Sequence, residues 1–247
     1  MIASLMMYRR PEIDGAIGRY WALIREELAT RGIDSPENLA QDAEEFAVWT
    51  APDLVLAQTC GMPYRTRLHD RVTLIGTPDF GVEGCPPGYY RSIFVIRADD
   101  PRARVADFAD SVLAFNAPIS QSGYAAPWSY ARARGFRFAR KLETGSHRAS
   151  ARAVAEGAAD IAALDAVSWR LIARYEPFAA KLAVLDATEP TPGLPYIAGP
   201  GADAAAGFAA VAAAIARLDP ADRMALGLKG MVAIPAADYL AIENPTD

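Results

Sequence analysis

The stretch N-A-P-I-S-Q-S-G-Y-A-A, residues 116–126, decides how the rest of the chain is interpreted. The apolar run just before it, residues 112–115, predicts a buried strand, and a helical pattern starts soon after it. Ser120, Gln121 and Ser122 therefore fall in a strand-to-helix turn. Such a turn holds the first amides of the helix, which have no partner within the helix itself.

This turn has the chemistry of an anion site. The unpaired amides and the positive end of the helix dipole favour a negative charge, and serine hydroxyls add donors that can rotate toward an oxygen. Gly123 has no Cβ to block a close approach. The alternative is that Ser120 or Ser122 only caps the helix, because serine is a favoured cap in any protein.

Composition excludes several function classes. The 247 residues carry a formal net charge of −5, whereas binding to nucleic acid or an anionic membrane surface needs a dense basic face. A metal site is not expected, because only two histidines are present and Cys60 and Cys85 have no C-x-x-C spacing. These cysteines can form a disulfide in an oxidising compartment and are otherwise expected to be buried thiols. No cofactor is predicted.

No apolar run approaches the length of a membrane-spanning helix, so no membrane insertion is expected. The N-terminal apolar stretch is too short for a signal peptide, and its basic pair follows the stretch instead of preceding it. The chain as written is therefore expected in the cytoplasm. It would be periplasmic if an export signal is missing from this sequence.

The first part of the chain predicts βα units. Residues 3–8 read as a strand, and a helix beginning near Pro11 follows. Residues 53–58 form a second predicted strand, which ends at Gln58 and Thr59. Its carboxyl end leads into a glycine turn, where open α/β sheets place ligands.

The middle of the chain reads as a second α/β segment bounded by two crossings. Residues 89–97 are a long β-rich run, and the proline-rich residues 188–196 form a stiff return. The sequence thus predicts an α/β protein whose second lobe is inserted into the first. Lobe I is expected at residues 1–90 plus 189–247, and lobe II at residues 91–188.

Several motifs together resemble one protein family. They are N-A-P-I-S-Q-S-G-Y, G-S-H-R-A-S-A-R-A-V-A-E-G-A-A-D-I-A-A-L-D-A-V-S-W, L-A-Q-T-C-G-M-P-Y, G-Y-Y-R-S and P-T-P-G-L-P. This combination, over about residues 53–198, is similar to the phosphate, phosphite and phosphonate substrate-binding proteins of ABC transporters. The resemblance implies a two-lobed type II periplasmic-binding-protein (Venus-flytrap) fold, no catalysis, and a phosphoryl group held at the helix start of Ser120, Gln121, Ser122 and Gly123.

The resemblance also implies partners: a small anionic ligand and an ABC permease, with the protein itself expected to be a monomer. One departure concerns the ligand. Many members have a Ser-Thr-Ser-Gly run where this chain has Gln121 between its serines, so an amide replaces one hydroxyl donor.

Further candidate ligand residues lie at strand ends and helix starts. Tyr64 and Tyr90 resemble the family's ligand-binding tyrosines, with core packing as the alternative. Gln58 and Thr59 can donate to a ligand or complete a turn.

His147 precedes a helix and can donate to an anion, although Ser146 capping that helix beside a surface His147 is the alternative. Asp165 ends a buried strand, where an unpaired carboxylate would be costly. It either accepts from an amino group of the ligand, as in an aminoalkylphosphonate, or caps the next helix.

An enzyme is the second hypothesis. Ser120, His147 and Asp165 follow the order nucleophile, base and orienting acid, but the G-x-S-x-G elbow of serine hydrolases is absent around Ser120. Some cytoplasmic enzymes share the two-lobed fold, including those of menaquinone and thiamine-precursor synthesis. The alternative is thus a cytoplasmic enzyme or sensor acting on a small metabolite.

Overall fold

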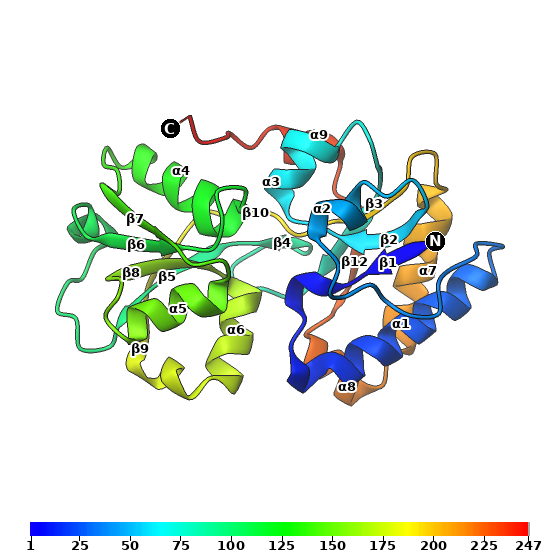
Figure 1. Ribbon diagram of the computed structural model, residues 1–247, viewed down its shortest axis with the longest axis horizontal. Coiled ribbons are helices and arrows are strands. Elements are labelled where there is room, and N and C mark those ends of the chain that lie inside the picture. Colours follow the sequence, from blue (N-terminus) through cyan, green and yellow to red (C-terminus); the bar gives the residue numbers. More distant parts are fainter. Residues whose placement is uncertain (247) are drawn as a thin grey trace. The chain divides into compact units, whose positions relative to one another are not determined.

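A computed structural model of the protein describes residues 1–246 (Figure 1). The chain forms two compact units. The first consists of Met1–Tyr89 and Pro192–Ala241, and the second of Tyr90–Thr191 and residues 242–246. The C-terminal residues thus belong to the second unit, whereas the sequence placed them with the first lobe. The connecting segments β4 (Tyr89–Tyr90) and β10 (Thr191–Pro192) pair as a two-stranded sheet.

The first unit contains a five-stranded sheet in the order β1-β2-β11-β3-β12. Its strands are β1 (Ile2–Ser4), β2 (Leu54–Gln58), β3 (Thr73–Asp79), β11 (Tyr196–Ala198) and β12 (Gly230–Val232). Strands β1 and β2 are parallel. Strand β11 follows the return crossing and lies antiparallel between β2 and β3, in the middle of the sheet.

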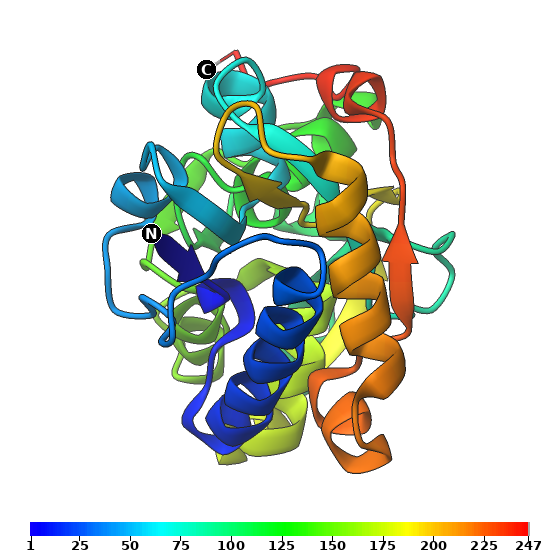
Figure 2. The same ribbon diagram turned by 90° about the vertical axis from the view of Figure 1, so that its right-hand side faces the viewer.

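Helices α1 and α7 contact each other in the first unit, and Figure 2 shows them side by side in blue and orange. The α-helices are α1 (Asp14–Ala29), α2 (Glu45–Trp49), α3 (Gly61–Pro63), α7 (Ala204–Arg217), α8 (Pro220–Leu226) and α9 (Ala236–Leu240). Short helical turns occupy Met6–Tyr8, Pro11–Ile13 and Tyr64–Leu68. Within residues 1–246 no single helix is long and apolar enough to cross a membrane, and one bent pair, α7 with α8, passes by length and composition alone.

The second unit contains a five-stranded sheet in the order β7-β6-β8-β5-β9. Its strands are β5 (Ser92–Arg97), β6 (Val112–Phe115), β7 (Arg140–Glu143), β8 (Ile161–Asp165) and β9 (Leu182–Ala187). Strands β7 and β8 flank β6 in parallel, whereas β5 runs antiparallel to both β8 and β9.

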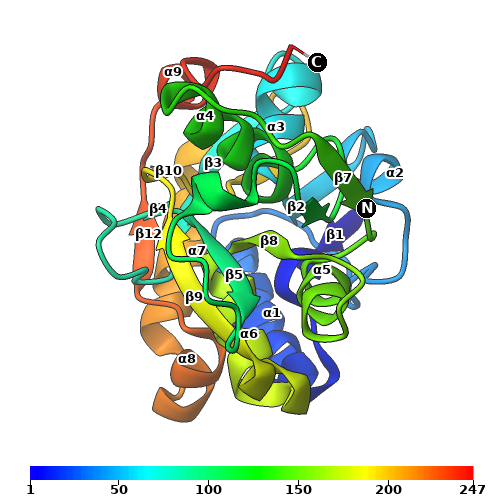
Figure 3. The same ribbon diagram turned by 90° about the vertical axis from the view of Figure 1, so that its left-hand side faces the viewer.

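Apolar cores cover both faces of this second sheet. Its helical segments are η4 (Val105–Phe108), η5 (Gln121–Ala125), α4 (Ala126–Ala133), α5 (His147–Ala155), α6 (Ala166–Tyr175) and η6 (Pro177–Lys181). Because side chains of a strand alternate between faces, Ile93 and Val95 pack into one core while Phe94 and Ile96 pack into the other. Figure 3 shows α4 on one face and α5 with α6 on the opposite face.

Some predicted elements were wrong. The strand expected at residues 3–8 ends at Ser4, and Met6–Tyr8 forms a short helical turn. The long strand expected at residues 89–97 is interrupted between β4 and β5. Strands β7, β11 and β12 were not predicted, because all three are short and lack the bulky alternating pattern of a half-buried strand.

Candidate functional site

Three neighbouring parallel strands end at the same edge of the second sheet. Each of the strands β6, β7 and β8 is followed by the start of a helix. The N-cap residues of these helices are Ser120, Ser146 and Asp165. The parallel register therefore collects three helix N-termini, each with the positive end of its dipole, at one edge of the sheet. We call Ser120, Gln121, Ser122, Gly123, His147 and Asp165 the helix-start site.

Ser120 is a capping residue, as the alternative interpretation proposed. Its hydroxyl oxygen accepts a hydrogen bond from the amide of Gly123 at 3.0 Å. Its carbonyl oxygen accepts from the amides of Tyr124 and Ala125. Ser120 is 4% exposed. Because its hydroxyl oxygen accepts from Gly123, the hydroxyl proton is what the side chain can donate to a ligand.

Ser122 has a different role, because its hydroxyl does not cap the helix. Its Oγ lies 2.9 Å from Nε2 of His147, so the contact joins the starts of η5 and α5. Its carbonyl oxygen accepts from the hydroxyl of Ser92 at 2.8 Å, which holds the turn against the start of β5. Among residues 1–246 the amide of Ser122 meets no acceptor.

His147 is neutral at physiological pH. Burial lowers the pKa of its imidazole to about 4. Its Nδ1 is buried without a hydrogen-bond partner among residues 1–246. An unpaired buried acceptor is tolerated better than an unpaired buried N–H, so the proton belongs on Nε2. In that tautomer Nε2 donates to Ser122, and the hydroxyl proton of Ser122 remains available to a ligand.

Glycine is required at position 123 by a close contact. A Cβ built there would lie 2.0 Å from Oδ1 of Asn116, the residue that follows β6. That oxygen is buried without a hydrogen-bond partner within residues 1–246. The tight turn therefore depends on the absence of a side chain at Gly123.

Asp165 caps α6, which was one of its two predicted roles. Its Oδ1 accepts from the amides of Val167 at 2.7 Å and Ser168 at 2.9 Å. The side chain is 2% exposed. These two hydrogen bonds from main-chain amides satisfy an oxygen of the buried carboxyl group.

Gln121 and Tyr90, the other two candidates in the second unit, are both buried at 3% exposure. Gln121 is the first residue of η5, and Tyr90 precedes the first residue of β5 by two positions. Ser92, at the start of β5, is register partner to Asp165 at the end of β8, so the chain around Tyr90 approaches the same edge of the sheet.

Of the predicted residues in the first unit, Gln58 and Thr59 lie at the carboxyl end of β2, and Tyr64 begins the helical turn after α3. The Gln58 side chain donates to the carbonyl of Leu194 at 3.2 Å, so it has a structural partner. Thr59 is fully buried, and its hydroxyl lacks a partner among residues 1–246. Tyr64 is 1% exposed and packs edge-on against Tyr239, as expected for a core residue.

Two residues that contact the helix-start site were missed. Ser92 binds the Ser122 carbonyl, and its own amide donates to Thr188 at 3.0 Å. Ser92 lies in the motif G-Y-Y-R-S, so the sequence did carry a signal for it. Asn116 begins the motif around the turn, but nothing in the sequence indicates its contact with Gly123.

Within residues 1–246 no cluster of three or more His, Cys, Asp and Glu side chains is arranged to hold a metal. Cys60 and Cys85 do not form a disulfide.

A family model described as "ABC transporter, phosphonate, periplasmic substrate-binding protein" matches residues 56–239. No curated protein matches the chain in sequence.

Several solved structures superpose on most of the chain. PhnD1 from Prochlorococcus marinus, in complex with methylphosphonate, matches with a TM-score of 0.67 and 15% identity over 97% of this chain and 94% of that one. A binding protein component of a phosphonate ABC transporter from Pseudomonas aeruginosa has the same score and identity over 97% and 82%. A Xanthomonas citri protein bound to ATP matches with a TM-score of 0.67 and 17% identity over 96% and 91%. At these identities the likeness concerns the fold, and the predicted two-lobed type II periplasmic-binding-protein fold is confirmed.

Proposed function

Because the chain belongs to the family of periplasmic substrate-binding proteins of phosphonate ABC transporters, we propose that it holds a phosphonate, phosphate or phosphite anion at the helix-start site. The protein is a transport solute-binding protein and not an enzyme. The predicted resemblance is thereby confirmed, and the enzyme hypothesis is not supported. An ABC permease is the partner that the family implies.

The observation that carries the proposed ligand site is the set of donors on Ser122. Its amide meets no acceptor among residues 1–246, and the His147 contact leaves its hydroxyl proton available. Both donors lie at a helix start, where the dipole stabilises an oxyanion. A phosphoryl oxygen supplies the acceptors that these donors lack.

The pKa of about 4 for His147 matters for this proposal. A neutral imidazole adds no charge to the site, so the anion is held by aligned dipoles and hydrogen bonds instead of a buried cation. This arrangement suits release to a partner, because the anion has no opposite charge to leave behind unpaired.

The remaining candidates are proposed as secondary contacts. Gln121, Tyr90 and Asp165 belong to the same unit as the helix-start site. Thr59 is the strongest candidate in the first unit because its buried hydroxyl lacks a partner within residues 1–246, and Gln58 and Tyr64 are proposed with it. We further propose that the protein works as a monomer in the periplasm, which light scattering and cell fractionation test.

Calorimetric titration of the purified protein with methylphosphonate, phosphate, phosphite and sulfate tests the proposal. We expect saturable binding of at least one phosphorus oxyanion and weaker binding of sulfate. Ser122→Ala should weaken that binding, whereas Ser129→Ala, which removes a hydroxyl from the same segment within α4, should not. The proposal is wrong if no phosphorus oxyanion binds, or if both variants bind like the parent protein.

A further inference from the structure

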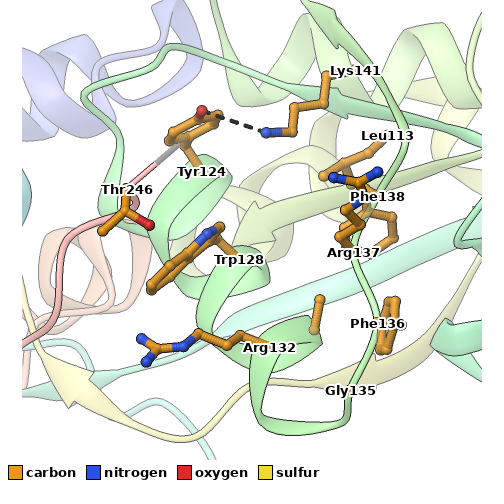
Figure 4. A pocket seen from close by; sticks show the side chains of 11 residues that line it. Leu113, Tyr124, Trp128, Arg132, Gly135, Phe136, Arg137, Phe138, Lys141 and Thr246 are labelled. Atoms are coloured by element: carbon orange, nitrogen blue, oxygen red, sulfur yellow. Dashed lines mark hydrogen bonds between the residues drawn. The ribbon is translucent and has the colours of Figure 1, made fainter.

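A cavity of about 660 Å³ in the second unit is lined by none of the residues that we call the helix-start site. Aromatic and basic side chains line it, among them Tyr124, Trp128, Phe136, Phe138, Arg137 and Lys141 (Figure 4). Ser120, Ser122, His147 and Asp165 do not line it. Its volume lies within the range of small-molecule sites, about 300–1,000 Å³.

The cavity has two walls, one formed by a helix face and the other by the segment that leads from α4 to β7. Tyr124, Trp128 and Arg132 follow each other at intervals of four residues, which places them on one helix face. Figure 4 shows this row opposite Phe136 and Phe138, which come from the segment that leads from α4 to β7. Phe138 is 6% exposed and belongs to the core, so this wall is anchored.

The charged side chains that line the cavity, Arg132, Arg137 and Lys141, are all positive, in a molecule of net charge −5. Residues 111–142 contain no aspartate or glutamate. Arg132 lies 5.2 Å from the ring of Trp128 and forms an ion pair of 2.7 Å with Glu243. Lys141 lies 4.9 Å from the ring of Tyr124.

Arg137 differs from these cations. Its guanidinium is exposed at the cavity and forms no ion pair or hydrogen bond with residues 1–246. An arginine at a cavity lined by aromatic rings can pair with a carboxylate or phosphate through two parallel bonds, while the rings stack on a planar group.

We propose that this cavity binds a small planar aromatic molecule that carries an anionic group. The ring lies between Trp128 and the Phe136–Phe138 wall, and the anionic group meets Arg137. The site is independent of the helix-start site, so the protein can hold this molecule together with a phosphorus oxyanion.

Quenching of tryptophan fluorescence by 2-naphthoate tests the proposal in the intact protein. We expect saturable quenching that persists in saturating methylphosphonate and is lost in Trp128→Phe. The neutral 2-naphthamide and the non-aromatic cyclohexanecarboxylate should bind at least about tenfold more weakly, since each lacks one of the two interactions. Calorimetry with the same compounds supplies binding constants for variants that lack Trp128.

Arg137→Gln should weaken the binding of 2-naphthoate about tenfold, because it removes the charge-assisted pair between the carboxylate and the guanidinium. Arg140→Gln is the matched control, because Arg140 is exposed in the same basic segment but does not line the cavity. Equal loss in both variants would mean a general charge effect and would overturn the proposal. So would displacement by methylphosphonate, equal binding of 2-naphthamide, or absence of saturable binding.

Discussion

The hydroxyl of Ser122 and the Nε2 atom of His147 lie 2.9 Å apart although they belong to two different helical segments, η5 and α5. These segments follow the neighbouring parallel strands β6 and β7, so the contact joins the two helix starts. With Nε2 as the donor, the Ser122 oxygen accepts and its hydroxyl proton points away from His147. The predicted ligand turn and the predicted ligand histidine are therefore one structural unit.

Stability should depend on pH through His147. The pKa of its imidazole is lowered from 6.5 to about 4 by burial, so the unfolded chain binds more protons than the folded chain between these values. The contribution of the neutral His147 to the free energy of unfolding is complete above pH 6.5 and is lost as the pH falls to about 4. Urea unfolding at several pH values should show that the stability difference between the parent and His147→Gln shrinks over this window.

The control for that experiment is His69→Gln, which removes the exposed histidine and leaves His147 in place. It should keep the pH profile of the parent protein. If the difference between the parent and His147→Gln is constant from pH 4 to 6.5, the assigned burial of the imidazole is wrong.

Replacing the two serines of the turn should separate capping from binding. Ser120→Ala removes the acceptor of the Gly123 amide and should lower stability by about 1 kcal/mol. Ser122→Ala should instead weaken the binding of methylphosphonate about tenfold or more, because a hydrogen bond to a charged group is lost. Chemical unfolding and calorimetry on both variants measure the two effects. If Ser120→Ala weakens methylphosphonate binding more than Ser122→Ala does, the roles of the two serines are the reverse of those assigned here.

Gly123→Ala should destabilise the second unit by about 1–3 kcal/mol, because the new Cβ overlaps the side chain of Asn116. Asn116→Ala removes the overlapping atoms and should restore much of the loss in the double variant. A double-mutant cycle measured by thermal unfolding gives the coupling. Additive effects would show that the contact is not the reason for glycine at this position.

Asp165→Asn keeps an oxygen to accept from Val167 and Ser168 while removing the negative charge. If Asp165 only caps α6, methylphosphonate and 2-aminoethylphosphonate should change in affinity by the same factor. We expect this result because the carboxylate is already engaged by two amides. A selective loss of 2-aminoethylphosphonate would instead assign Asp165 to the amino group of the ligand.

The sequence predicted the elements whose local signals agree with their tertiary environment. The helix expected after Pro11 is α1, and its apolar residues Ile17, Tyr20 and Ile24 are buried at helical spacing. The strands expected at residues 53–58, at residues 112–115 and before Asp165 are β2, β6 and β8. Capping by Ser120 or Ser122, by Ser146 and by Asp165 was foreseen as the alternative to a ligand role, because each residue precedes a helical pattern, and the caps are Ser120, Ser146 and Asp165.

What the sequence missed depends on long-range pairing. Strand β11 has only three residues and exists because β2 and β3 supply hydrogen bonds on both sides. The Ser122–His147 contact needs the parallel register of β6 and β7, and β7 itself was not predicted. The role of Ser92 required the pairing of β5 with β8, which no local pattern encodes.

The amide resonance of Ser122 in a ¹H–¹⁵N NMR titration with methylphosphonate tests the central claim most directly. We predict a saturable downfield proton shift for this amide, with the same midpoint as calorimetry, because an unpaired amide gains a charged acceptor. The result that would contradict the account is an unmoved Ser122 resonance in protein that calorimetry shows to be saturated with methylphosphonate.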